Sequence, residues 1–215
     1  MTTSTRKPGA MSELRRRRVR LEISREAARL FWEQGVAATS GEQIAASVGL
    51  SVRTLWRHFR TKESCAEPIV ARSAEWFVTA LHRWPPELSI EDHLAATRAE
   101  LRRTPEELAD DLAGVRMMVL GDTEPALRSA WLMTCDHVEK ELAAVIADRL
   151  GRPADDVEVR THAAAAGGAM RVLNESLGPA VLAGEDLTGI PDPFQSMARV
   201  VRVATSGAVG DPVDS

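Results

Sequence analysis

The residues best suited to chemistry lie in the stretch VGLSVRTLWRHFRTKES, at positions 48–64. If residues 51–59 form a helix, then at about 100° per residue Arg53, Thr54 and Arg57 share one side. The apolar residues of the segment fall on the opposite side: Val52, Leu55 and Phe59. Guanidinium and hydroxyl groups on one helix face are the chemistry that bonds guanine edges and phosphates in the major groove of DNA. This pattern therefore predicts a nucleic-acid-reading face.

Motifs for other chemistry are missing from the sequence. It contains no GxSxG, no Walker A glycine loop and no HExxH. The five histidines share no helical spacing: His58, His82, His93, His137 and His162. Asp136 is adjacent to His137, but neighbouring side chains on a helix point apart. We therefore expect a protein that is not an enzyme and uses no metal or cofactor.

Charge divides the chain into two parts. The 215 residues carry a net charge of −4, but residues 1–65 hold 13 Lys and Arg against 6 Glu, while the remainder holds 14 against 25 Asp and Glu. A basic segment ahead of an acidic body indicates a polyanionic partner for the front. The four consecutive arginines at 15–18 are consistent either with a solvated tail or with an arm that adds salt-dependent affinity for DNA.

The elements that would position the reading face are short helices. Apolar residues recur at three- and four-residue steps from Val19 to Phe31, and Gly35 follows where a helix would end. Ser40 with Gln43 three residues later forms a capping box for a second helix, which Gly49 ends. Ser51 caps the third helix. A helix, a glycine turn and a helix with a basic outer face together make a helix-turn-helix pattern, whose helix amino ends can receive phosphates.

The stretch REAARLFWEQGVAATSGEQIAASVGLSVRTLWRHFRTKES, residues 25–64, resembles the DNA-binding domain of the TetR family of bacterial transcriptional regulators. The matching features are the aromatic residue and glycine that end helix one, the IA pair, GLS at the turn, TLWRHF in the recognition helix, and TKE at the start of helix four. Two positions depart from the family pattern. Val52 stands where a lysine is common, and Trp56 stands where a tyrosine is usual, which puts phosphate bonding at both positions in question.

The pattern and the resemblance together give one predicted set of DNA-contacting residues: Ser40, Gly41, Ser51, Arg53, Thr54, Trp56, Arg57, His58 and Lys62. Lys62 belongs to it because it resembles a phosphate-contacting lysine of the family. Trp56 has the alternative of covering the small core. His58 either faces phosphate or caps the surface of the domain.

The predicted fold is all-α. A flexible basic arm at 1–18 precedes a three-helix DNA-binding domain at 19–64, a helical ligand-binding and dimerisation domain at 65–206 and a disordered tail at 207–215. Proline, glycine, aspartate and threonine bound the body helices expected at about 90–103, 105–120 and 125–150.

The last two helical segments predict a homodimer. Small residues near Ala166 and Met170 permit close approach of another helix, and a stripe runs along the final helix. The predicted interface residues are Ala166, Met170, Phe194, Met197, Val201 and Ala204. Packing within one chain is the alternative. The family resemblance implies a dimer, and a palindromic double-stranded DNA operator requires two-fold symmetry.

Large, soft side chains in the middle helices suggest a ligand pocket, with an arginine to meet an anionic group. The candidates are Trp76, Phe77, Arg116, Met117, Met118, Arg128, Trp131 and Met133, and plain core packing is the alternative for each. The body also resembles, through WPPELSIEDHL, TEPALRSAW and ELAAVIADRLG, a TetR subgroup with acyl-coenzyme A-like ligands.

These observations predict a sequence-specific transcriptional regulator, a repressor released from its operator by an unknown small apolar or amphipathic effector. The alternative is a ligand-independent DNA-binding protein, architectural or constitutive, whose body only dimerises. Because no run approaches the roughly 20 apolar residues of a membrane span and the N-terminus lacks the apolar run of a signal peptide, we expect a cytoplasmic protein without a membrane partner.

Overall fold

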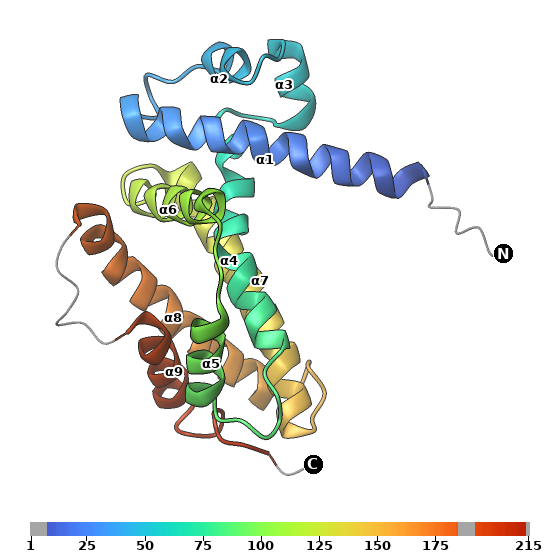
Figure 1. Cartoon of the computed structure of the whole chain (residues 1–215), viewed down its shortest axis with the longest axis vertical. Helices are drawn as coiled ribbons and strands as arrows, with labels where there is room; N and C mark the ends of the chain where they lie inside the picture. The colour runs from blue at the N-terminus through green and yellow to red at the C-terminus, as the bar shows by residue number, and fades with distance from the viewer. Residues whose placement is uncertain (1–7, 185–191, 214–215) are drawn as a thin grey trace.

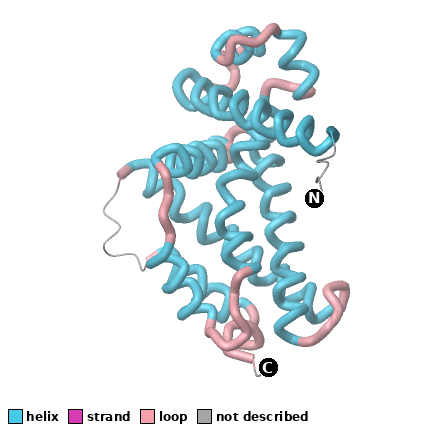
Figure 2. The backbone as a smooth tube through the Cα atoms, turned by 45° about the vertical axis from the view of Figure 1, so that its right-hand side comes forward, coloured by secondary structure: helices cyan, strands magenta, loops and turns pink. Residues whose placement is uncertain are grey.

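The computed structural model describes residues 8–184 and 192–213, and every regular element in these ranges is helical (Figures 1 and 2). The elements are α1 (Pro8–Gln34), α2 (Gly41–Ser47), α3 (Val52–His58), the 3-10 turn η1 (Glu63–Ala66), α4 (Glu67–His82), α5 (Ile90–Glu100), α6 (Pro105–Leu120), α7 (Pro125–Leu150), α8 (Val157–Ala183) and α9 (Pro193–Ala204). This confirms the predicted all-α fold class. No helix in the described ranges is long and apolar enough to cross a membrane.

The three N-terminal helices gather at one end of the molecule (Figure 1). α1 crosses beside α2 and α3 and continues well past them, while α4 and α7 run down the length of the body. The beginnings of α2 and α3 are fixed locally. Ser40 Oγ accepts from Gln43 N at 3.3 Å, Gln43 Oε1 accepts from Ser40 N at 2.7 Å, and Ser51 Oγ accepts from Thr54 N at 3.2 Å. These caps satisfy helix-end amides that would otherwise lack partners.

The core of the DNA-binding domain is completed by the body. It contains Phe31, Ile44 and Leu55, all fully buried, together with Met117 of α6 and Leu127 of α7. A second cluster, formed by α4, α5, α7, α8 and α9, fills the body. The first cluster therefore extends well beyond the expected domain boundary at residue 64.

The prediction of a flexible arm over 1–18 is wrong for residues 8–18, because these residues form the first turns of α1. Apart from Pro8 and Gly9 at its start, this stretch is rich in good helix formers, Met, Leu, Glu and Arg. An i,i+4 ion pair joins Glu13 to Arg17 at 3.3 Å. The rest of the expected arm, residues 1–7, lies outside the described residues.

The prediction of a disordered tail at 207–215 is also corrected, because most of these residues pack on the body. They belong to a segment that we call the C-terminal strap, residues 205–213. Val209 is buried, and Gly210 O accepts from Ile90 N at 2.8 Å. Arg202 forms ion pairs at 2.7 Å with both Glu91 and Asp211. The chain turns back at Gly207, whose φ of +79° suits glycine. Residues 214–215 lie outside the described ranges.

The predicted dimer stripe faces the interior of its own chain, which corrects the interface prediction. Ala166, Met170, Met197 and Val201 belong to the body core, each at most 9% exposed. Phe194 packs against Trp76, with ring centroids 5.2 Å apart, and Ala204 is half-buried. A short amphipathic helix buries its apolar face against the nearest apolar surface. For α9 that surface is formed by α5 and α8 of the same chain.

Substitution of Val201 tests this placement, and Val203 is the matched control because it is 71% exposed on the same helix while Val201 is 1% exposed. Val201→Glu places an unpaired charge in the core, so we expect the free energy of unfolding to fall by several kcal/mol. Val203→Glu should change it by about 0.5 kcal/mol or less. Urea denaturation measures both values. A Val201→Glu protein that is fully stable but monomeric would instead show that the stripe forms the dimer interface.

Candidate nucleic-acid interface

The recognition helix α3 is anchored on one side and free on the other. Leu55 is fully buried and Phe59, which ends the helix, is 3% exposed. Arg53 and Arg57 lie exposed on the remaining surface, and Thr54 is half-buried. The Thr54 hydroxyl lies 2.9 Å from the hydroxyl of the cap residue Ser51. The arrangement leaves two guanidiniums available to bases and phosphates.

Trp56 holds α3 against the first turn of α2. Its ring lies so close to Gly41 that a Cβ at that position would overlap it. Gly41 is buried, and Trp56 is 42% exposed. Gly41 therefore matters because it has no side chain. The space that a side chain would fill is occupied by the indole ring of Trp56. Trp56 thus packs on the start of α2 while part of its side chain stays exposed, next to Arg57 in the sequence.

The structure places Lys62 differently from the phosphate contact that the family resemblance implies. Its Nζ donates to Val36 O at 2.6 Å, Thr39 O at 2.8 Å and Ala37 O at 3.5 Å. These carbonyls belong to the loop between α1 and α2. Since an ammonium has three donors, the loop engages all of them. Lys62 here stabilises the loop that leads into the helix-turn-helix.

His58 lies at the end of α3 in a strongly basic setting. Burial lowers the pKa of its imidazole, and the nearby Arg16, Arg20 and Arg57 lower it further. Its backbone carbonyl accepts a hydrogen bond from Arg20, whose guanidinium also lies 4.2 Å from the centre of the Phe59 ring. Within the described part of the chain, its Nδ1 is buried without a hydrogen-bond partner.

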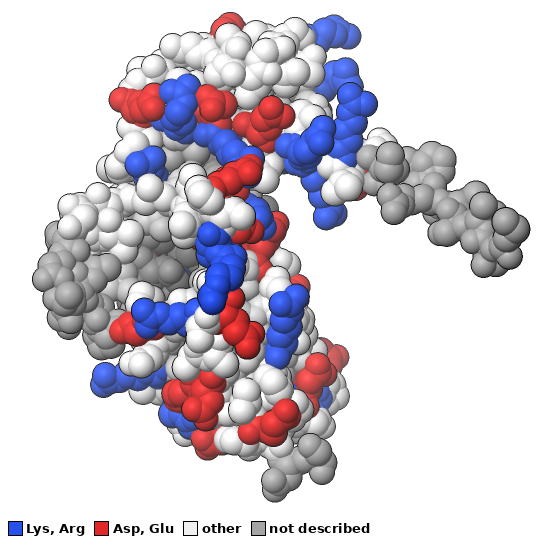
Figure 3. All heavy atoms as spheres, in the orientation of Figure 1, with Lys and Arg blue, Asp and Glu red and all other residues white. Residues whose placement is uncertain are grey.

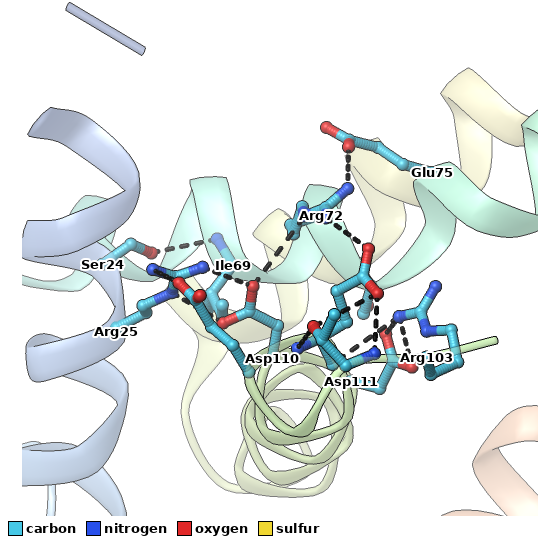
Figure 4. A network of polar contacts seen from close by, with 12 residues as sticks. Ser24, Arg25, Ile69, Arg72, Glu75, Arg103, Asp110 and Asp111 are labelled. Carbon is cyan, nitrogen blue, oxygen red and sulfur yellow. Dashed lines mark hydrogen bonds and ion pairs between the residues drawn. The ribbon is translucent and has the colours of Figure 1, made fainter. Parts of the chain in front are cut away.

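A polar network joins the DNA-binding domain to the body (Figure 4). Arg25 of α1 donates from Nε and Nη2 to the two carboxylate oxygens of Asp110 in α6, each at 2.7 Å. Ser24 Oγ accepts from the backbone N–H of Ile69 in α4 at 2.9 Å. Arg72 of α4 lies 3.8 Å from Asp110. The hydrogen bonds to Asp110 are the main cause of a raised pKa for Arg25.

Sequence reasoning missed this network. Arg25 and Asp110 are 85 positions apart, and each lies among other charged residues with nothing to distinguish it. The local pattern is no guide, because Leu108 and Ala109, which precede Asp110, are both exposed. Such a pattern gives no partner without the fold.

The structure does not bring the predicted ligand-pocket residues into one lining. Trp76 and Phe77 belong to the body cluster, whereas Met117 lies in the core of the DNA-binding domain. The others are also dispersed: Met118 contacts Gly178, Arg128 and Trp131 both donate to Glu175, and Arg116 lies over Trp32. Met133 is 67% exposed. The set therefore divides between two cores and the surface.

An exposed basic recognition helix on a helix-turn-helix, joined to a helical body, defines the class of DNA-binding transcriptional regulators. Residues 23–69 match the family described as bacterial regulatory proteins, tetR family, and residues 95–180 match the MftR C-terminal domain. The HTH-type transcriptional regulator TcmR of Streptomyces glaucescens is 35% identical over 159 residues, which cover 72% of this chain and 70% of that protein. The chain belongs to the TetR family, whose members are regulators rather than enzymes and typically dimerise.

Solved structures show the same fold. Salmonella enterica GusR superposes with a TM-score of 0.52 at 22% identity, covering 89% of this chain and 95% of that one. A transcriptional regulator from Rhodococcus sp. Rha1 superposes with a TM-score of 0.53 at 16% identity, covering 91% and 99%. The likeness spans the DNA-binding domain and the body.

Proposed function

We propose that the chain is a homodimeric transcriptional repressor that reads a palindromic operator through α3 and is released by a small apolar or amphipathic ligand bound in its body. The observation that carries the proposal is the exposed pair Arg53 and Arg57 on a helix whose other face buries Leu55 and Phe59. Thr54 and the capped helix ends at Ser40 and Ser51 add donors beside them. In a dimer, the two α3 helices enter successive major grooves about 34 Å apart.

Arg53 and Arg57 provide the direct test, on an operator selected from random DNA. Arg53→Ala or Arg57→Ala should cost about 1 to 3 kcal/mol of binding and relax preference at one base position. Arg199→Ala, an exposed arginine of α9, is the control and should leave binding unchanged. Fluorescence anisotropy with matched base-substituted duplexes measures both effects. Unchanged affinity and preference in both reading-face variants would show that the face is assigned wrongly.

Release by ligand is supported by the continuous connection between body and reading domain. α6 and α4 contact α1 directly, and their polar contacts converge on Asp110. A ligand that separates α4 from α6 acts on the same contacts that orient α1, and so changes the distance between the two recognition helices. The resemblance of the body to the subgroup with acyl-coenzyme A-like ligands makes such thioesters the first class to test.

The alternative function is a DNA-binding protein whose body only dimerises. A thermal melt against a metabolite library that includes acyl-coenzyme A thioesters separates the two functions. A ligand at 100 times its dissociation constant should stabilise the fold by about 2.7 kcal/mol and weaken operator binding. If no compound in the library stabilises the fold or weakens operator binding, the ligand-independent function is favoured.

We place the dimer contact on the outer face of α8, opposite the buried side that holds Ala166 and Met170. Ala164 and Val172 are exposed on this face, and nothing approaches the position that a Cβ at Gly168 would occupy. Val172 is 54% exposed, a large value for an aliphatic side chain in the middle of a long helix. Small residues around it let a partner helix approach closely, and a two-fold axis would bring the same patch of each chain together.

Val172→Glu should therefore produce folded monomers, because symmetry places the charge in the interface twice. Val181→Glu is the control: its side chain is 43% exposed, and nine residues along the helix rotate it by about 180° from Val172. Sedimentation velocity at micromolar concentration gives the masses. A dimeric Val172→Glu protein would move the interface to another surface.

A further inference from the structure

A pocket of about 540 Å³ lies beside the recognition helix, between α1, the end of α3 and the segment leading into α4. Arg16 and Arg20 line it from α1, Arg57 lines it from α3, and Arg60 lines it from the residues that follow. Among the described residues of its wall, Glu67 is the one carboxylate. Four guanidiniums against one carboxylate make a strongly positive concave surface.

The arginines of this pocket differ in what already engages them. Arg20 is anchored, because it donates to the carbonyl of His58 and stacks over the Phe59 ring. Arg16, Arg57 and Arg60 are exposed and form no ion pair within the described residues. His58 lines the same pocket; burial is the first cause of its lowered pKa, and the charges of Arg16, Arg20 and Arg57 lower it further. Among the described residues, the pocket thus has three exposed guanidiniums that form no ion pair.

We propose that this pocket binds a phosphate group, and that in the operator complex the group is a backbone phosphate lying outside the base pairs that α3 reads. Guanidiniums from separate elements can hold a phosphate through paired N–H···O bonds. Such a contact fixes the position of the domain on DNA and carries no base preference. This inference rests on the proposed DNA-binding function and adds a second contact region to it.

The position of the pocket supports a backbone phosphate. Arg57 belongs both to the reading face and to the pocket wall, so the two surfaces are continuous. Arg16 lies on α1, whose N-terminal part extends beyond α2 and α3 (Figure 1). Lys and Arg side chains gather over α3 and this adjoining part of α1 (Figure 3). The basic surface therefore continues from the reading face onto α1, where it could contact DNA next to the half-site.

The test compares the double variant Arg16→Ala/Arg60→Ala with Arg17→Ala as control. Arg17 is a neighbouring arginine of α1, 77% exposed, which pairs with Glu13 and does not line the pocket. Arg20 is left in place because it ties α1 to α3. Binding is measured over a range of salt concentrations, on the operator with long flanks and on a duplex trimmed to the ends of the half-sites. Binding to a nonspecific duplex of equal length gives the salt dependence even if the chain selects no operator from random DNA.

We expect the double variant to lower the slope of log K against log salt by about 0.9, the value for the one phosphate contact that is lost, without changing base preference. Trimming the flanks should weaken the wild-type protein and Arg17→Ala but have little effect on the double variant. A double variant with the wild-type slope and the wild-type dependence on flank length overturns the assignment to DNA.

A free phosphate compound is the other source of the same chemistry, and pyrophosphate titrated into the DNA-free protein is its probe. A rise in melting temperature that is absent in the double variant, together with unchanged salt and flank dependence on DNA, would support the phosphate site and overturn the DNA backbone as its source. If neither pyrophosphate nor DNA distinguishes the double variant from the wild type, the pocket binds no phosphate.

Discussion

The orientation of the reading domain depends on one buried carboxylate. The Asp110 side chain is 3% exposed, and Arg25 binds it through two hydrogen bonds of 2.7 Å. A buried charge that loses its partner costs several kcal/mol, so α1 and α6 do not separate at this point without a compensating contact. A movement of α6 either carries α1 with it or exposes Asp110 to water. The DNA-binding domain is therefore coupled to the body through a specific ion pair as well as through packing.

Packing enforces the same connection. Met117 of α6 is fully buried among residues of α1 to α4, and so is Leu127 of α7. Close-packed interiors transmit displacement, because side chains have little free volume into which to move. The helices of the body thus complete the core of the DNA-binding domain, so the two predicted domains share packed residues.

Local signals in the sequence predicted the elements well. Pro105–Leu120 and Pro125–Leu150 occur as expected because a proline begins each helix and a glycine follows each one. The helix-turn-helix was predictable for the same reason, since Ser40, Gly49 and Ser51 determine its caps and turn from within a few residues. The division of α3 into an apolar side and a basic side followed from the helical period alone.

Long-range choices were not predictable. The stripe on α9 is equally suited to a partner chain and to α5 and α8, and only the fold decides between them. Arg25 and Asp110 come together because α1 crosses α6, which no local pattern encodes. Lys62 resembles a phosphate ligand by position, yet the carbonyls of the α1–α2 loop lie within its reach. In each case a side chain has two chemically suitable partners, and tertiary geometry selects one.

The C-terminal strap has a consequence for the order in which the protein forms during synthesis. Among the described residues, the apolar residues of the core beneath the reading helix end at Trp131, whereas the body core includes Val201 and Val209. Because the N-terminal part of a chain emerges from the ribosome first, the DNA-reading end can assemble while the far end of the body is still open. That end closes only when the strap emerges and Gly210 meets Ile90. A polypeptide released before that point would carry a formed recognition helix on an unfinished body.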